Sequence, residues 1–250
     1  MEYIGLPKSC ALDKVIFKKI FTEQANLTKA EKQLLSEQIE KVIWHYNIKP
    51  ANMNIDAYKD EEREYEEIQV IEVKVTSKDK VKKVSELIMT TIPYPIVLEV
   101  ICHDENLLVL GESVINRNDS SKHVIKEILM TTWLNINGLN TKEQIFLESI
   151  HISNLSSRNL YKLYQDLIEH IVRFNASLLT NTYIEKTDAK IIKEQYDAIT
   201  DLDKQIEGIK AKIRKESQFN KRLELNVQVK RLEKQKVQMI EALTGGKNDE

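Results

Sequence analysis

The chain has 250 residues, of which 42% are hydrophobic, and this is enough to build one large globular domain or two smaller ones. With 30% charged residues but only six glycines and four prolines, it is expected to be rich in helix and poor in long loops, which excludes a disordered chain. The formal net charge of -2 is near neutral, but a near-neutral total is compatible with local clusters of positive or negative residues.

The two cysteines and the lack of long apolar stretches bear on the cellular location. Cys10 and Cys102 are far apart and form no CxxC pair, so neither a zinc site nor a disulfide framework is expected. The first residues do not follow the pattern of a signal peptide, and no window approaches the roughly 20 apolar residues of a membrane span. We therefore expect a soluble, cytoplasmic protein with no membrane contact.

The first predicted helix begins at a capping box. Thr28 and Glu31 have the spacing at which a hydroxyl and a carboxylate satisfy free backbone amides at a helix start. Apolar residues then recur at helical spacing up to Tyr46, which predicts a helix over Lys29–Tyr46 that ends before Pro50. Trp44 lies near this stripe and is expected in the core.

Three further elements predict a pair of parallel strands. The segment Glu67–Thr76 is rich in β-branched residues and alternates, as a strand does. Lys80–Thr91 has the apolar spacing of a helix and is closed by Pro93 and Pro95, and Ile96–Ile101 is an apolar run of strand length. A strand, a helix and a strand in this order indicate a right-handed crossover between parallel neighbours.

The chain then continues with a hairpin strand and a helix. Leu107–Leu110 follows a polar turn and is expected to pair with the preceding strand. Val124–Leu134 fits both a helical stripe and a strand, and the threonines and the tryptophan at its end favour strand. Apolar residues at helical spacing predict a helix over 156–179, capped by Ser156 or Ser157.

From Asp188 onward the pattern is that of a long amphipathic helix with one interruption. Apolar residues step by three and four from Ile192 to Ile213 and again from Leu225 to Leu243. The stripe fails over Ser217–Asn220, which favours two antiparallel helices over one straight rod. Each arm of roughly 25 residues would be ~38 Å long.

Together these elements predict a mixed-sheet α/β or α+β domain followed by a C-terminal antiparallel coiled-coil hairpin. The domain covers residues 1–183, with a sheet of about four strands and flanking helices. The hairpin covers residues 184–244, and a disordered tail covers residues 245–250.

Basic residues gather where the two C-terminal helices are expected to meet. Between Lys204 and Lys236 there are eleven Lys and Arg against four Glu. Six of the basic residues flank the bend: Lys210, Lys212, Arg214, Lys215, Lys221 and Arg222. A positive tip of this kind is suited to nucleic-acid phosphates or an acidic partner. The alternative is the solvated, charged face of an ordinary coiled coil.

Three other residues resemble part of a metal-dependent nuclease site. In such a site Asp56 and Glu72 would hold Mg²⁺, while Lys74 would orient the attacking water. The pattern has low specificity, because Glu-x-Lys is common on half-exposed strands and no proline precedes Asp56. The five histidines are scattered without metal-ligand spacing, so we expect no metal and no cofactor.

Six short segments carry a resemblance to a known family: Leu6-Pro7-Lys8-Ser9, Ile43-Trp44, Glu67-Ile68-Gln69-Val70, Ile92-Pro93-Tyr94-Pro95-Ile96, Thr132-Trp133 and Lys215-Glu216-Ser217-Gln218-Phe219-Asn220. In these segments the chain resembles one bacterial and archaeal family, known as domain of unknown function 4391. The resemblance covers nearly the whole chain. It implies a genomic setting beside helicases and DNA methyltransferases, but no catalytic residue, and relatives often lack the lysine of the Glu-x-Lys triplet.

The hypothesis that follows is a non-enzymatic accessory subunit of a bacterial DNA-processing or antiphage defence complex. It would dock a helicase or DNA methyltransferase from the same locus and would reach DNA through the basic tip. Two alternatives remain open: a nuclease that uses Asp56, Glu72 and Lys74, and a homo-oligomeric coiled-coil scaffold in which hairpins pair into a four-helix bundle.

Overall fold

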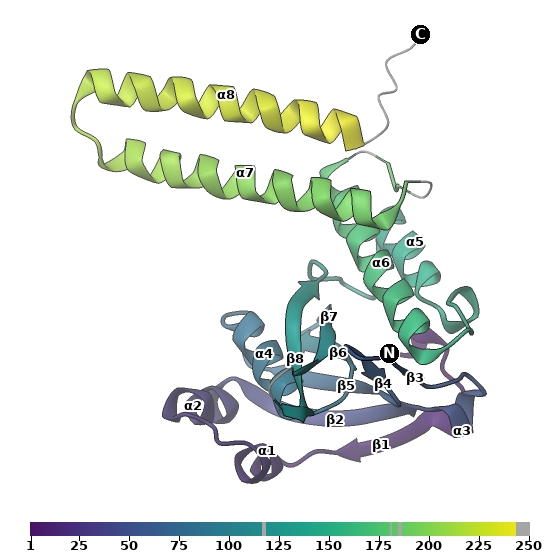
Figure 1. The fold of residues 1–250 in the computed structure, drawn as a ribbon. Coiled ribbons are helices and arrows are strands. Elements are labelled where there is room, and N and C mark those ends of the chain that lie inside the picture. The colour runs from purple at the N-terminus through teal and green to yellow at the C-terminus, as the bar shows by residue number, and fades with distance from the viewer. Residues whose placement is uncertain (117–118, 181, 185–186, 244–250) are drawn as a thin grey trace. The chain divides into compact units, whose positions relative to one another are not determined.

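A computed structural model describes residues 1–116, 119–180, 182–184 and 187–243, apart from the side chains of residues 24 and 119–122 (Figure 1). The contacts divide the chain into two compact units, Met1–Ile171 and Val172–Glu250. The predicted disordered tail at 245–250 lies outside the described residues.

Helices and strands alternate irregularly along the chain. The helices are α1 (Lys18–Gln24), α2 (Lys29–Glu37), α3 (Pro50–Met53), α4 (Val81–Thr91), α5 (Thr141–Ser149), α6 (Leu160–Leu179), α7 (Ala189–Lys215) and α8 (Phe219–Leu243), with short 3₁₀ turns η1 (Glu2–Ile4), η2 (Lys8–Cys10) and η3 (Ile152–Asn154). The strands are β1 (Ala11–Val15), β2 (Ile39–Ile48), β3 (Tyr58–Lys59), β4 (Glu64–Tyr65), β5 (Ile68–Val75), β6 (Ile96–Cys102), β7 (Glu105–Asn116) and β8 (Asp119–Met130).

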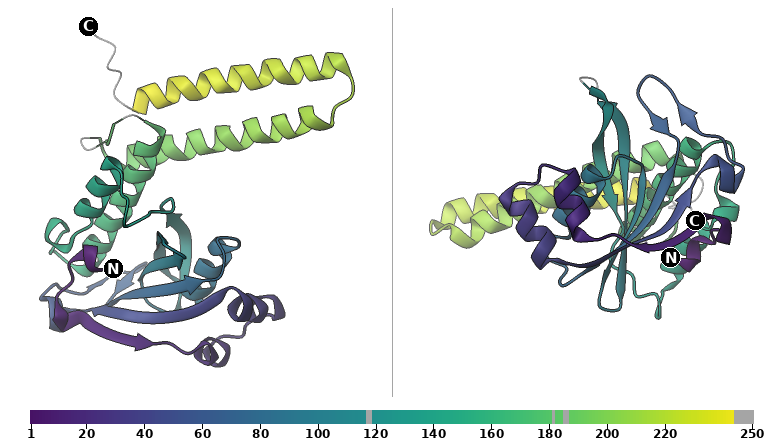
Figure 2. Two further views of the ribbon diagram at one scale, coloured as in Figure 1. Left: turned by 180° about the vertical axis from the view of Figure 1, so that it is seen from behind. Right: turned by 90° about the horizontal axis from the view of Figure 1, so that it is seen from below.

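Six of the strands form one mixed sheet in the order β1-β2-β5-β6-β7-β8, and β3 pairs with β4 in a separate small hairpin (Figure 2). Among the described strands only β5 and β6 pair in parallel, and α4 connects them, which confirms the predicted parallel pair. The predicted pairing of β7 with β6 is also confirmed. The expected number of about four strands is wrong, because β1 and β2 were not recognised as strands.

The largest error concerns the first helix. The capping box is present, since the Thr28 side chain accepts from the Glu31 amide and the Glu31 carboxylate accepts from the Thr28 amide. However, α2 ends at Glu37, and Ile39–Ile48 is strand rather than helix. This segment is rich in β-branched and aromatic residues, and pairing with β1 on one side and β5 on the other outweighs its helical spacing.

The later predictions need smaller corrections. The segment from Val124 forms β8 as far as Met130, and the strand does not reach Leu134. The long helix begins at Leu160 rather than at Ser156, and the side chain that accepts a backbone amide at its start belongs to Asn159, which bonds the Lys162 amide at 2.8 Å. An asparagine is as good a cap as a serine, so sequence alone does not choose between them.

The main core lies on one face of the sheet. Side chains from α1, α2 and α4, including Phe21, Leu34 and Ile88, pack against Val73 of β5 and Leu98 of β6. Since side chains alternate along a strand, Glu72 and Glu99 lie on the opposite face. The first half of α6 reaches the sheet through Tyr164, whose hydroxyl accepts from the Gly111 amide at 3.0 Å and lies 2.7 Å from the Ile96 carbonyl oxygen.

In the second unit, α7 and α8 lie side by side and run in opposite directions (Figures 1 and 2). Lys236 pairs with Asp203 at 2.6 Å and Lys210 pairs with Glu233 at 3.1 Å. Residue numbers therefore increase along α7 in the direction in which they decrease along α8, so the two helices are antiparallel. The chain leaves helical structure over 216–218, at the predicted interruption. Within the described ranges, no helix is both long enough and apolar enough to span a membrane.

Candidate functional site

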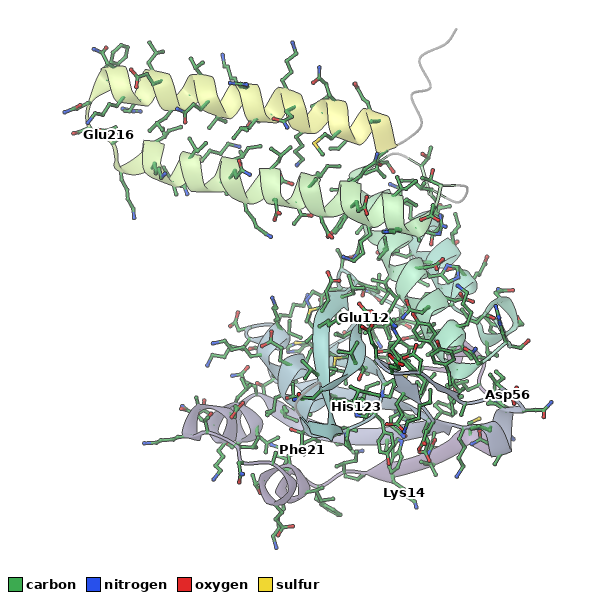
Figure 3. All side chains as sticks on the ribbon, in the orientation of Figure 1. Lys14, Phe21, Asp56, Glu112, His123 and Glu216 are labelled. Carbon is green, nitrogen blue, oxygen red and sulfur yellow. The ribbon has the colours of Figure 1, made fainter. Side chains whose placement is uncertain are left out.

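The six predicted basic residues surround the turn between α7 and α8, where Glu216 is labelled in Figure 3. Lys212, Arg214 and Lys215 lie in the last turn of α7, where positive charge is favoured by the free carbonyl groups of a helix end. Lys221 and Arg222 lie in the first turns of α8, where positive charge is disfavoured by the free amides. Two of the six basic residues therefore lie where helix stability alone would not place them.

The cluster has few acidic partners. Lys210 is paired with Glu233 at 3.1 Å and lies 3.8 Å from Glu207. In the part of the chain that the structure describes, no ion pair engages the other five, which are exposed: Lys212, Arg214, Lys215, Lys221 and Arg222. The three lysines of this set line a shallow depression of about 500 Å³ beside the turn, together with Glu216 and Glu224. Since the five cations themselves have no acidic partner among the described residues, they are available to an anion.

A second group of charged residues crosses the sheet on the face opposite the main core. The His45 ring lies between two carboxylates, with Nδ1 2.8 Å from Asp13 Oδ1 and Nε2 3.0 Å from Glu72 Oε2. Partial burial lowers the pKa of His45, but the hydrogen bonds with Asp13 and Glu72 outweigh it, so the pKa lies above its ordinary value. The His45 imidazole thus joins the edge strand β1 to the central strand β5 through β2, and its two carboxylate neighbours favour the protonated ring.

The neighbouring strand β6 continues this row with a buried carboxylate. Glu99 pairs in register with Glu72, is 1% exposed, and accepts hydrogen bonds at 2.8 Å from the Tyr3 hydroxyl and the Asn106 amide. The Met1 amino nitrogen lies 3.4 Å from its other oxygen. Burial and the Glu99 carboxylate raise the pKa of Tyr3 well above its usual range, so the tyrosine stays a neutral donor.

The three residues of the nuclease hypothesis have separate surroundings. Glu72 is hydrogen-bonded to His45, and Lys74 Nζ lies 3.4 Å from Glu40. Asp56 is exposed in the segment after α3, and its backbone oxygen accepts from the Leu160 amide. Within the described residues there is no group of three or more His, Cys, Asp or Glu side chains arranged to hold a metal ion.

The profile of the family described as Domain of unknown function (DUF4391) matches residues 4–235. The chain belongs to this family. The match includes the six-stranded sheet, α7, the basic turn and most of α8, so both units are part of what DUF4391 members share. No curated protein and no solved structure matches the chain significantly.

Sequence reasoning found Glu72 and the basic turn but missed the residues that surround Glu72. Asp13, His45 and Glu99 are distant in sequence, and only the strand register brings them together. The one available signal was the presence of single charged or polar residues in otherwise apolar strand segments, such as Glu99 within Ile96–Cys102. A carboxylate in that position requires partners.

Proposed function

We propose that this member of DUF4391 is a non-enzymatic interaction subunit of a bacterial DNA-processing or antiphage defence complex, acting in the cytoplasm. In this proposal α7 and α8 form a coiled-coil hairpin whose basic turn contacts DNA phosphates. The observation that carries the proposal is the set of five exposed cations at the turn that lack acidic partners within the described chain. A genomic setting beside helicases and DNA methyltransferases, which the family resemblance implies, supplies the class of protein partner.

Phosphate contact explains why Lys221 and Arg222 occupy the start of α8. The positive charge of each residue interacts unfavourably with the helix dipole. Binding of a phosphate, with release of counterions, would offset this unfavourable interaction. Contact through about five cations predicts a slope of roughly -4 to -5 in a plot of log K against log salt concentration. Binding of this kind carries little sequence preference, as expected of a subunit whose partner supplies the specificity.

The proposal is tested by charge reversal at the turn. Binding of the full chain to a fluorescein-labelled DNA duplex is measured by anisotropy over a salt series, for the wild type and for the variant R214E/K215E/K221E/R222E. We expect the variant to lose most of its affinity and most of the salt dependence, since each phosphate contact accounts for about one unit of slope.

A matched control separates the turn from overall charge. The variant K8E/K29E/K32E/K41E changes the net charge by the same amount at exposed positions in the first unit. It should keep nearly all of the DNA affinity. Equal affinity of the wild type and the turn variant, or equal losses in the two variants, would remove the basic turn from the account.

Partner docking has its own test. Co-expression with the helicase or DNA methyltransferase encoded in the same locus should yield a complex that survives purification at low salt. Recovery of this chain alone would contradict the proposed subunit role. The nuclease alternative has less support, because Glu72 and Lys74 already have partners of their own.

A further inference from the structure

Helix α8 carries two apolar stripes. At about 100° per residue, Phe219, Leu223, Val227 and Val237 fall within an arc of roughly 80°. The other large apolar residues lie roughly 100 to 180° from the centre of that arc: Leu225, Val229, Leu232, Met239, Ile240 and Leu243. A helix with two apolar stripes needs a cover for each of them.

Only one stripe is covered within the helical pair. On the side toward α7, Val229 and Leu243 are 6% and 2% exposed. The other stripe is open, with exposures of 77% for Phe219, 56% for Leu223, 61% for Val227 and 53% for Val237. Four large apolar side chains in one line on one helix exceed the scattered exposure that is normal for a protein surface.

The open stripe is basic between its apolar positions. By the same helical arithmetic, Lys230 and Lys234 fall in the arc between Val227 and Val237, and Arg231 borders it. None of these three has an acidic partner among the described residues. We call Phe219, Leu223, Val227, Lys230, Lys234 and Val237 the outer face of α8.

We infer that the outer face of α8 is a docking site for an amphipathic helix of a partner protein, with acidic residues beside its apolar stripe. The face is a straight strip about 27 Å long from Phe219 to Val237, and a second helix can pack along such a strip with its backbone already hydrogen-bonded. An extended segment would leave its backbone groups unpaired there. The inference rests on the proposed function only in that the chain works with a protein partner.

Charge favours this occupant over two others. A second copy of the same face would gather Lys230 and Lys234 of both copies in one contact, and like charges are unfavourable where water is excluded. Nucleic-acid phosphates would meet Leu223, Val227 and Val237, which offer them no hydrogen bond. An acidic amphipathic helix satisfies both the lysines and the apolar side chains.

The test uses a defined probe, a fluorescein-labelled peptide of about 21 residues, which spans about 30 Å as a helix. Leucines recur in it at spacings of three and four, with glutamates beside them, and a second peptide has lysines in place of the glutamates. The full chain should bind the acidic peptide, and Leu223→Asp with Val227→Asp should weaken that binding at least about tenfold. The lysine peptide should bind at least about tenfold more weakly than the acidic one.

Two control variants make the result specific. Gln228→Asp with Gln235→Asp adds the same charge to exposed positions of α8 outside the outer face, and it should bind the peptide as the wild type does. The double variant K221E/R222E should also keep peptide binding, so failure of the DNA proposal and failure of this one are distinguishable. Circular dichroism should show equal helix content in all variants.

Three results would overturn the inference. The first is the absence of acidic-peptide binding to the wild type. The second is a dimer in light scattering that becomes monomer in L223D/V227D, which would make the face a contact between copies. The third is loss of DNA affinity in L223D/V227D with no loss of peptide binding, which would assign the face to nucleic acid.

Discussion

Charged residues in the two units are arranged in opposite ways. Across the sheet, His45 lies between Asp13 and Glu72, and Glu99 receives hydrogen bonds from Tyr3 and Asn106. Around the turn of α7 and α8, five cations are exposed with no carboxylate paired to them among the described residues. Paired and buried charge stabilises a fold, whereas unpaired charge on a surface is available to a ligand. The comparison therefore favours a structural role for the row on the sheet, and it leaves the turn as the candidate binding surface of our proposal.

The largest expected effect is at Glu99. Replacing it with alanine leaves the Tyr3 hydroxyl and the Asn106 amide without their acceptor, and a broken buried network of this kind costs about 3 kcal/mol. Urea unfolding followed by tryptophan fluorescence measures this, because Trp44 and Trp133 both belong to the first unit. A loss of unfolding free energy below about 1 kcal/mol would contradict the structural role of the charged row on the sheet, since Glu99 would then contribute little to folding.

The next effect is at His45 and depends on pH. Since the folded-state pKa is raised, the stabilisation is complete below the ordinary pKa of about 6.5 and is lost as pH rises through the raised value. His45→Gln should cost about 1.5 kcal/mol near pH 6 and less in alkaline solution. Equal losses at both pH values would show that the imidazole is not charged between Asp13 and Glu72.

A smaller effect is expected within the helical pair. Asp203→Asn removes the ion pair with Lys236. Since the Asp203 and Lys236 side chains are 43% and 26% exposed, the loss of unfolding free energy should be at most about 1 kcal/mol and should shrink with added salt. The control is Asp201→Asn, which breaks a more exposed pair with Lys204 on the same helix. Thermal unfolding followed by circular dichroism should show a smaller loss for the control.

The smallest effect has the opposite sign. Lys221→Glu with Arg222→Glu places negative charge at the start of α8, where the free amides favour it, and should stabilise the helix by up to about 0.5 kcal/mol. Circular dichroism at low salt is the measurement. Destabilisation would indicate that these cations support the fold, and the contrast between the two units would fail.

The sequence predicted those elements that depend on local signals. The capping box at Thr28, the apolar run Ile96–Ile101 and the interruption predicted at Ser217–Asn220 are each readable within a few residues. All three were found, although the interruption ends two residues earlier, where α8 begins at Phe219. Ile39–Ile48 was misread as helix, because its strand character comes from β1 and β5, which pair with it from distant positions. Local spacing alone does not decide between these two structures.

The same distinction applies to the candidate sites. The basic turn was predictable because its residues are close in sequence. The contacts of Glu72 with His45 and of Glu99 with Tyr3 were not, since they depend on register and on the position of η1. The outer face of α8 was missed for another reason: Val229 and Leu232 already gave the helix one apolar stripe, and the second stripe, which begins at Phe219, lies on another side of the same helix.

The hydroxyl of Tyr164 has a consequence for the exchange of amide protons with solvent. The ladder between β6 and β7 ends at Val97 and Leu110, and the next pair, Ile96 and Gly111, is joined through this phenol instead. The Gly111 amide can exchange only in molecules in which Tyr164 has moved away from the strands. Its exchange rate therefore reports how often the first half of α6 detaches from the sheet, and a Tyr164→Phe variant should make this one proton exchange early.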